Sequence, residues 1–163
     1  MTAILRDCHA GDAPALANLI RALAVYEKLG DQALATPEAL RRDLFGDRPF
    51  AEAILAEVKG AAVGFALFFP TYSTFRGQPG LFLEDLFVAP EHRGQGIGKR
   101  LIAAVAARAV SRGCGRLEWA VLDWNAPSIA FYQALGATPM DQWTTFRLVD
   151  DPLARLAIEA NPR

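Results

Sequence analysis

Two adjacent carboxylates, Glu84 and Asp85, interrupt an apolar run in the stretch LEDLFVAPEHRGQGIGKRL (83–101). A carboxylate in an apolar strand costs several kcal/mol unless it is paired. A protonated amine would supply that partner for Glu84, and an arginine of the chain itself is the alternative. Because side chains alternate along a strand, Glu84 is expected on one face, and Asp85 on the other. We therefore expect that the two carboxylates do not act on one substrate group, and that Asp85 forms a structural ion pair or fixes neighbouring backbone.

Three glycines follow at alternate positions, Gly94, Gly96 and Gly98, where the sequence indicates the start of a helix. A helix N-terminus presents unpaired N–H groups to an anion, and glycine lets a ligand approach the backbone closely. With the charges of Arg93 and Lys99, the pattern predicts a pyrophosphate site, and a simple turn is the alternative. The run matches neither the P-loop nor the dinucleotide-binding fingerprint, because its glycines are wrongly spaced for both.

The elements that must position these residues follow from periodicity, caps and turns. Asp12 and Thr36 are expected to cap the first two helices, and Gly46 to end the second. The pattern predicts strands over 3–6, 53–58, 62–69, 80–88, 116–122 and 143–149, a loop over 70–80, and helices over 13–27, 37–45, 96–112, 125–135 and 152–158. The order of the expected elements predicts an α/β layered fold: two helices precede an antiparallel meander, and a β-α-β-α-β segment comes last.

The composition fits one globular domain over 1–163, with 52% hydrophobic and 21% charged residues. A net charge of −1 and the lack of a Lys/Arg cluster argue against a nucleic-acid partner. No apolar run has the length of a membrane span, so no membrane partner is expected. Two cysteines, Cys8 and Cys114, make neither a disulfide framework nor a zinc site, which favours a cytoplasmic location.

The motif V-x-P-x-x-R-G-x-G-I-G (88–98) resembles the acyl-CoA-binding motif of the GNAT N-acetyltransferases. The segments YEKLGDQ, FGDRPF, FPTYSTFRG, FLEDLFV and VLDWNAPSIAFYQALGA are similar to the diamine (spermidine/spermine) acetyltransferase branch, and closest to its thialysine acetyltransferases. The resemblance covers residues 3 to 149. It implies a GNAT fold with a mixed, mostly antiparallel, V-splayed sheet of about six to seven strands flanked by helices. It further implies acetyl-CoA as co-substrate, no metal, direct transfer to a small amine, and a homodimer.

By the same resemblance, the coenzyme is held by the glycine run, by the strand before it and by a later helix. The strand would pair with the pantetheine arm, and the backbone amides would bind the pyrophosphate. The residues so implied are Leu86, Phe87, Val88, Arg93, Gly94, Gln95, Gly96, Ile97, Gly98, Lys99, Asn125, Ser128 and Tyr132.

Tyr132 is the candidate general acid. A phenol with a pKa near about 10 stays protonated at neutral pH and can protonate a thiolate leaving group. Asn125 and Tyr132 are seven apart in the helix NAPSIAFYQALG, so they lie on nearly one face. The alternatives are a core aromatic and an ordinary helix cap. The resemblance implies that Tyr132 is the proton donor and that Glu84 takes the proton of the amine, through water rather than directly.

The acceptor site implied by the resemblance is drawn from several segments. Its residues are Tyr26, Glu27, Ser73, Thr74, Glu84, Glu118, Trp119 and Ala120. Ser73 and Phe75 replace an acid and a tryptophan of the polyamine-selective relatives, and Arg76 would repel a polycation. A lysine-like amine is therefore predicted above a polyamine. Other open readings are a non-catalytic acyl-CoA sensor and acetylation of protein amines, and ATPMDQW after Gly136 leaves the distal pocket undefined.

Overall fold

A computed structural model describes residues 2–160, which fall into two compact units divided between Leu122 and Asp123. The first unit holds one sheet of five strands in the order β1-β2-β3-β4-β5, namely β1 (Ile4–Asp7), β2 (Glu52–Val58), β3 (Ala61–Ser73), β4 (Gln78–Val88) and β5 (Leu117–Trp119). The pairs from β1 to β4 are antiparallel, and β4 pairs with β5 in parallel. The mixed, mostly antiparallel sheet is therefore confirmed.

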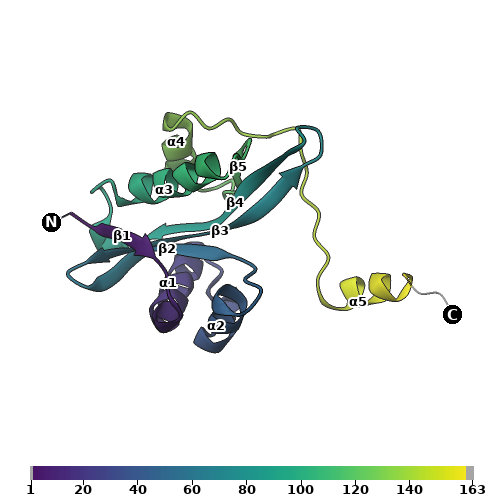
Figure 1. The fold of residues 1–163 in the computed structure, drawn as a ribbon, viewed down its shortest axis with the longest axis horizontal. Coiled ribbons are helices and arrows are strands. Elements are labelled where there is room, and N and C mark those ends of the chain that lie inside the picture. The colour runs from purple at the N-terminus through teal and green to yellow at the C-terminus, as the bar shows by residue number, and fades with distance from the viewer. Residues whose placement is uncertain (1, 161–163) are drawn as a thin grey trace. The chain divides into compact units, whose positions relative to one another are not determined.

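Helices cover both faces of this sheet. One face carries α1 (Ala13–Tyr26) and α2 (Pro37–Phe45), and the other carries α3 (Ile97–Ser111) (Figure 1). Three short 3-10 helices, η1 (Ala10–Asp12), η2 (Gly30–Gln32) and η3 (Pro90–His92), lie in the connections. Since both faces are covered, the central strands are apolar at consecutive positions rather than at alternate ones, as in the buried stretch Ala53 to Ala56 of β2.

The core on the α1 side is one cluster in which helix and strand side chains meet. Leu16, Leu19 and Leu23 of α1 pack there with Phe65 and Phe87 of the sheet. The core on the α3 side is a second apolar layer. Its buried residues include Ile54, Ala66, Phe68, Leu81, Leu83, Leu101, Ile102 and Val105.

Local signals for α2 are confirmed. The Thr36 hydroxyl accepts a hydrogen bond from the Ala39 amide at 3.2 Å, and Pro37 is the first helical residue. The helix ends at Phe45 before Gly46, where a Cβ would come within 2.5 Å of the Arg42 carbonyl oxygen. Asp12 does occupy the N-cap position of α1, but its carboxylate makes no capping hydrogen bond, because it pairs with Arg6 at 2.6 Å and accepts from the His9 amide.

The second unit contains α4 (Ala126–Ala134) and α5 (Asp150–Ile158). The Asn125 side chain caps α4 by accepting from the Ser128 amide at 3.3 Å, as its sequence predicts. The strand expected over 143–149 is wrong, because these residues form no strand in the described structure and the Phe146 side chain is 90% exposed. Residue types that favour strands, such as Trp143, Thr144 and Phe146, do not make a strand by themselves, because each strand needs a partner for its backbone groups.

The strand number also differs from the expectation. Residues 2–160 contain five strands, so the sheet of six to seven strands is not confirmed. The expected strand 116–122 is shortened to Leu117–Trp119, and part of the expected loop 70–80 is strand, since β3 reaches Ser73 and β4 begins at Gln78. No helix among the described residues is long and apolar enough to cross a membrane.

Candidate active site

A β-bulge in β4 places Glu84. Leu67 of β3 lies opposite Asp85, whereas the next residue, Phe68, lies opposite Leu83, so Glu84 is an extra residue without a partner across the pair. Bulges interrupt the alternation of side chains and bend the strand. The bulge breaks the regular alternation between Leu83 and Asp85, while the expected placing of Glu84 and Asp85 on different faces stays a prediction.

The bulge puts Asp85 on the α1 face of the sheet. Directly opposed residues share a face, so Asp85 lies on the side of Leu67, which belongs to the α1 core cluster. Phe87 lies on that side too, opposite Phe65, as expected. Leu83, two residues before Asp85, lies on the other side with Phe68. The side-chain direction changes across Glu84.

The charges of two carboxylates, Glu84 and Glu27, act on a third, Asp85, at this point. Burial, followed by the charges of Glu84 and then Glu27, raises the pKa of Asp85 to about 7. Burial also raises the pKa of Glu27. Glu27 follows the last residue of α1, Tyr26, so the helix end and the bulge are brought together. The grouping of Tyr26, Glu27 and Glu84 expected for the acceptor side is present in the first unit.

Neither carboxylate of the bulge has a partner within the described part of the chain. The side chains of Glu84 and Asp85 form no ion pair or hydrogen bond among residues 2–160. The structural ion pair expected for Asp85 is therefore wrong, and an arginine partner for Glu84 is absent from the described residues. A negative charge that is unmatched by the protein favours a cation at this place.

The glycine loop (residues 93–98) leads from β4 into α3. Gly94 and Gly96 have φ of +74° and +76°, and Gly96 is the residue that precedes the helix. No side chain of the described residues caps the helix, and its first backbone hydrogen bond runs from the Arg100 amide to the Gly96 carbonyl oxygen. A Cβ at Gly94 or Gly96 would meet no atom within 4 Å. Free amides beside open space fit the phosphates of an acyl coenzyme.

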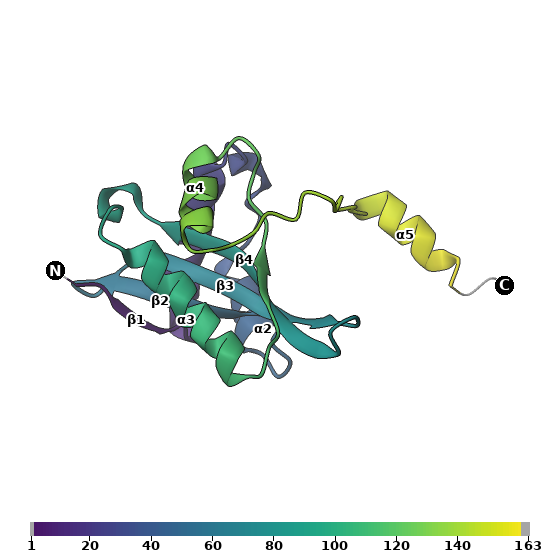
Figure 2. The same cartoon turned by 90° about the horizontal axis from the view of Figure 1, so that it is seen from above.

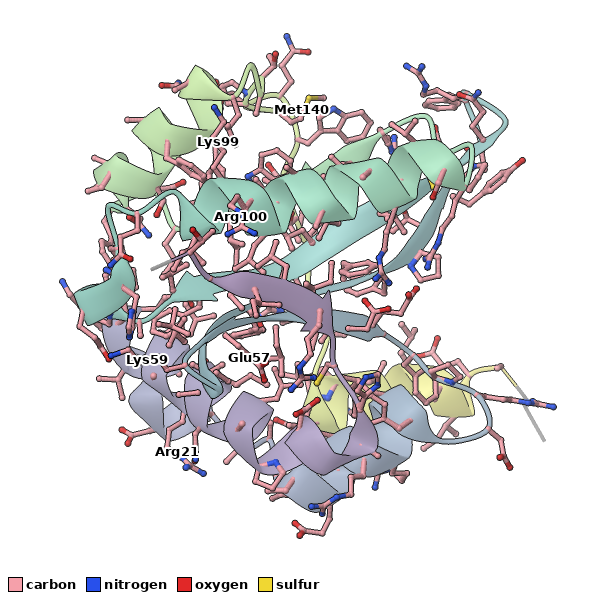
Figure 3. All side chains as sticks on the ribbon, turned by 60° about the vertical axis from the view of Figure 1, so that its left-hand side comes forward. Arg21, Glu57, Lys59, Lys99, Arg100 and Met140 are labelled. Atoms are coloured by element: carbon pink, nitrogen blue, oxygen red, sulfur yellow. The ribbon has the colours of Figure 1, made fainter. Side chains whose placement is uncertain are left out.

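The two cations at the start of α3 have different surroundings. The Arg100 guanidinium points toward the start of β1 (Figure 3), and it donates to the carbonyl oxygen of Ala3, the residue before that strand, at 2.7 Å. Lys99 extends from the side of α3 away from the sheet (Figure 3). Lys99 is exposed, so its ammonium can approach an anion at the helix start.

Arg93 points toward α1. Its Nε donates to the Val88 carbonyl oxygen at 2.8 Å, and its Cζ lies 4.4 Å from the centre of the Tyr26 ring and 5.6 Å from that of Phe87. The contact of Arg93 with the coenzyme stays a prediction. Its contact with Tyr26, an acceptor-site candidate, was not predicted from the sequence. No sequence signal shows it, because Tyr26 and Arg93 are far apart in the chain.

The second half of β4 has a free edge. β5 pairs with β4 only over residues 81–83, and the last partner pair is Leu83 with Trp119. Residues 85–88 thus pair with β3 alone within the described structure. This free edge contains Leu86 and Val88, the strand expected to pair with the pantetheine arm.

The other acceptor candidates of the first unit are spread along the sheet. Trp119 lies opposite Leu83, beside the bulge, and Ala120 follows it. Glu118 lies 2.7 Å from the Nε of Arg116, which matches its charge. Ser73 is buried, and its hydroxyl accepts from the Arg76 amide in the turn that joins β3 to β4.

The turn that carries Ser73 and Thr74 lies at the other end of β4 from the glycine loop (Figure 2). Ser73 pairs with Gln78, and the six residues from there to Glu84 span about 20 Å of strand. Within one copy of the chain, the structure therefore does not bring Ser73 and Thr74 to the bulge.

The second unit carries Asn125, Ser128 and Tyr132 on α4. Asn125 is buried, and its side chain is the helix cap described above. The Tyr132 ring lies 5.3 Å from that of Phe131, centre to centre. Both residues lie on the helix predicted from the sequence, which confirms the element that carries the proposed acid.

A groove of about 500 Å³ lies beside the site, lined by Asn18, Arg21, Ala22, Val25, Tyr26, Phe87 and Pro90. No carboxylate lines it, so it is not the place where an amine would meet Glu84. Among the described residues, no group of three or more His, Cys, Asp or Glu side chains is placed to hold a metal.

Comparison with known proteins decides the family. Residues 23–137 match the acetyltransferase (GNAT) family. The chain belongs to the GNAT acetyltransferases. Members of this family use acetyl-CoA as co-substrate, and the free amides of the glycine loop and the free edge of β4 are consistent with it.

Two curated relatives and one solved structure show the likeness of this GNAT acetyltransferase in detail. A thialysine N-epsilon-acetyltransferase of Bos taurus is 42% identical, over 94% of this chain and 96% of its own length. A human spermidine/spermine N(1)-acetyltransferase-like protein 1 is 33% identical, over 95% of this chain but 24% of its own. An integron cassette protein from V. cholerae has a TM-score of 0.82 at 25% identity, covering 97% of this chain and 99% of that one. The chain is an N-acetyltransferase.

Proposed function

We propose that the enzyme transfers the acetyl group of acetyl-CoA directly to the side-chain amine of a thialysine-like or lysine-like amino acid. The observation that carries this proposal is the unpaired Glu84 in the bulge, with Asp85 and Glu27 close enough to act on one another. An alkyl amine has a pKa near about 10.4, so it arrives as a cation, and three carboxylates attract it.

Each group then has a role in proton movement. Glu84 is exposed, so water can reach it and carry the amine proton to its carboxylate. The free amine is the nucleophile, and the coenzyme supplies the activated acetyl group. Tyr132 returns a proton to the coenzyme thiolate. We assign the glycine-loop amides and Lys99 to the coenzyme phosphates, and the free edge of β4 to the pantetheine arm.

The acceptor class is proposed from sequence likeness, because the turn between β3 and β4, whose residues differ from those of the polyamine-selective relatives, lies away from the bulge within one copy of the chain. Residues 74–77, Thr-Phe-Arg-Gly, contain no acid, and Arg76 would repel a long polycation. Identity to the thialysine enzyme, at 42%, exceeds identity to the spermidine/spermine relative, at 33%, and supports the same order. Acetylation of spermidine or another polyamine is the second candidate. A non-catalytic sensor is less well supported, because it would not need both Glu84 and Tyr132.

Competition between thialysine and spermidine for a limiting amount of acetyl-CoA tests the acceptor class. Mass spectrometry of the products gives the ratio of the two kcat/KM values directly. We expect a preference for thialysine of at least about tenfold, or 1.4 kcal/mol. A preference for spermidine would assign the enzyme to the polyamine acceptors instead.

We also propose a cytoplasmic homodimer. Both cysteines, Cys8 and Cys114, are free thiols, which suits a reducing compartment. Large apolar side chains are exposed in the second unit, among them Trp143 at 71% and Phe146 at 90%. Exposed apolar patches mark interaction sites. Light scattering after gel filtration should give twice the 17.7 kDa chain mass, and a monomer mass would exclude the dimer.

A further inference from the structure

Arg93 joins the glycine loop to the end of α1. It is the first residue of the loop, yet its guanidinium lies 4.4 Å from the centre of the Tyr26 ring, the last residue of α1. The same group contacts the Phe87 ring at 5.6 Å, and its Nε donates to the Val88 carbonyl oxygen at 2.8 Å. One side chain thus holds together the end of β4, the loop and the helix end.

We infer that Arg93 is a positioning residue for the acceptor, acting through Tyr26. Glu27 follows Tyr26 directly, and the Glu27 carboxylate is close enough to Asp85 for its charge to act there. Holding the Tyr26 ring therefore holds Glu27 beside the bulge. This inference rests on the proposed function, in which the amine binds at these carboxylates.

The contacts of Arg93 with the Tyr26 ring and the Val88 carbonyl oxygen require a planar guanidinium. A guanidinium stacks on an aromatic face and still donates through Nε, whereas a lysine ammonium keeps the charge but loses the planar contact and this fixed fork. Arg93→Lys therefore removes the stack on the Tyr26 ring but keeps the positive charge that a coenzyme phosphate would meet. A stack at an exposed position changes an equilibrium by about 2- to 5-fold.

The test measures acceptor binding in a double-mutant cycle between Arg93→Lys and two changes at Tyr26. The acceptor KM at saturating acetyl-CoA is measured together with the calorimetric Kd of thialysine, with coenzyme A present. We expect Arg93→Lys to raise both constants about 3-fold or more in the parent and in Tyr26→Phe, which keeps the ring. In Tyr26→Leu, which lacks the ring, Arg93→Lys should change neither constant.

Arg21→Lys is the matched control. Arg21 is an exposed arginine on the same helix, and its guanidinium donates to the side-chain Oδ1 of Asn18 at 3.4 Å rather than stacking on a ring. We expect it to leave both constants within about twofold, because it removes no aromatic contact. Melting temperatures show that each variant is folded.

The outcomes separate this inference from the proposed function. An unchanged acceptor KM and Kd in Arg93→Lys would overturn the inference, and so would an equal effect in the Tyr26→Leu background. Failure of the parent enzyme to bind or acetylate any amine would instead overturn the proposed function.

Discussion

Asp85 lies opposite Leu67 on the α1 face of the sheet, and it reaches that face because Glu84 is an extra residue in β4. Without the bulge, Leu83 and Asp85 would point to one side, and an apolar residue and a carboxylate would compete for the same core. With it, Leu83 stays in the α3 core, while Asp85 meets Glu84 and Glu27. The bulge thus forms the acidic side of the proposed site.

Asp85→Asn should change stability in a pH-dependent way. The folded pKa of Asp85 is raised to about 7, above its ordinary value of 3.8, chiefly by burial. Between these pH values the unfolded chain has lost a proton that the folded protein keeps, so stability falls as pH rises from about 4 to 7. Asp85→Asn has no ionisable group at this position, so its stability does not fall in this way as pH rises. Relative to the difference between the two proteins at pH 4, the variant should be more stable than the parent at pH 8 by roughly 3–4 kcal/mol.

Urea unfolding of the parent and Asp85→Asn at pH 4 and pH 8 measures this difference. The expected result is a variant-minus-parent free energy of unfolding that increases with pH. The same difference at both pH values would contradict a raised Asp85 pKa.

Glu84→Gln should lower kcat by about 10²-fold or more, because the amine loses its proton acceptor. The loss should be largest at low pH, where deprotonating the amine is hardest. The pH–rate profile of the variant against the parent checks this. Glu91→Gln, an exposed glutamate of η3, serves as the control and should keep the parent profile. A Glu84→Gln profile of unchanged shape and height would remove Glu84 as the base.

Tyr132→Phe should lower kcat by about 10- to 100-fold, because it removes only the hydroxyl that donates the proton. General acid catalysis typically contributes about 10²- to 10⁴-fold, so this effect lies at or below the lower end. Acetyl-CoA affinity should stay nearly unchanged, since the ring remains beside Phe131. Single-turnover rates and calorimetric binding separate the two effects. Tyr72→Phe is the matched control, because it removes the hydroxyl of an exposed tyrosine on β3. Full kcat in Tyr132→Phe would exclude the acid role.

Gly96→Ala should weaken acetyl-CoA binding as well as stability. Its φ of +76° is strained for alanine, by roughly 1–2 kcal/mol, and the added methyl group would occupy the space beside the loop amides. Gly113→Ala is the control, because its φ of +68° gives similar strain at the other end of α3. Both variants should melt at lower temperature, but only Gly96→Ala should raise the acetyl-CoA Kd. Equal Kd values in the two would argue against coenzyme binding at the loop.

The sequence predicts best what neighbouring residues decide. Thr36, Pro37 and Gly46 set the limits of α2, and the structure agrees with each of them. The Asn125 cap was foreseen for the same reason, since its partner amide is three residues away. Caps and turns depend on local geometry, which the sequence shows directly.

Features that depend on pairing between distant segments were not foreseen. The bulge at Glu84 exists because β3 fixes the register of β4, and no local pattern marks it. The contact of Arg93 with Tyr26 is likewise a product of the fold. The segment 143–149 is the opposite case: its residue types favour a strand, but it forms none, because a strand also needs a partner edge.

The central claim is acetyl transfer to a small amine, and thiol release from acetyl-CoA tests it most directly. The parent enzyme is assayed with thialysine, lysine, spermidine, putrescine, a lysine peptide, or no acceptor. We predict release that depends on the acceptor and is fastest with thialysine. Acetyl-CoA binding without thiol release above the acceptor-free rate, for every amine, would contradict the claim.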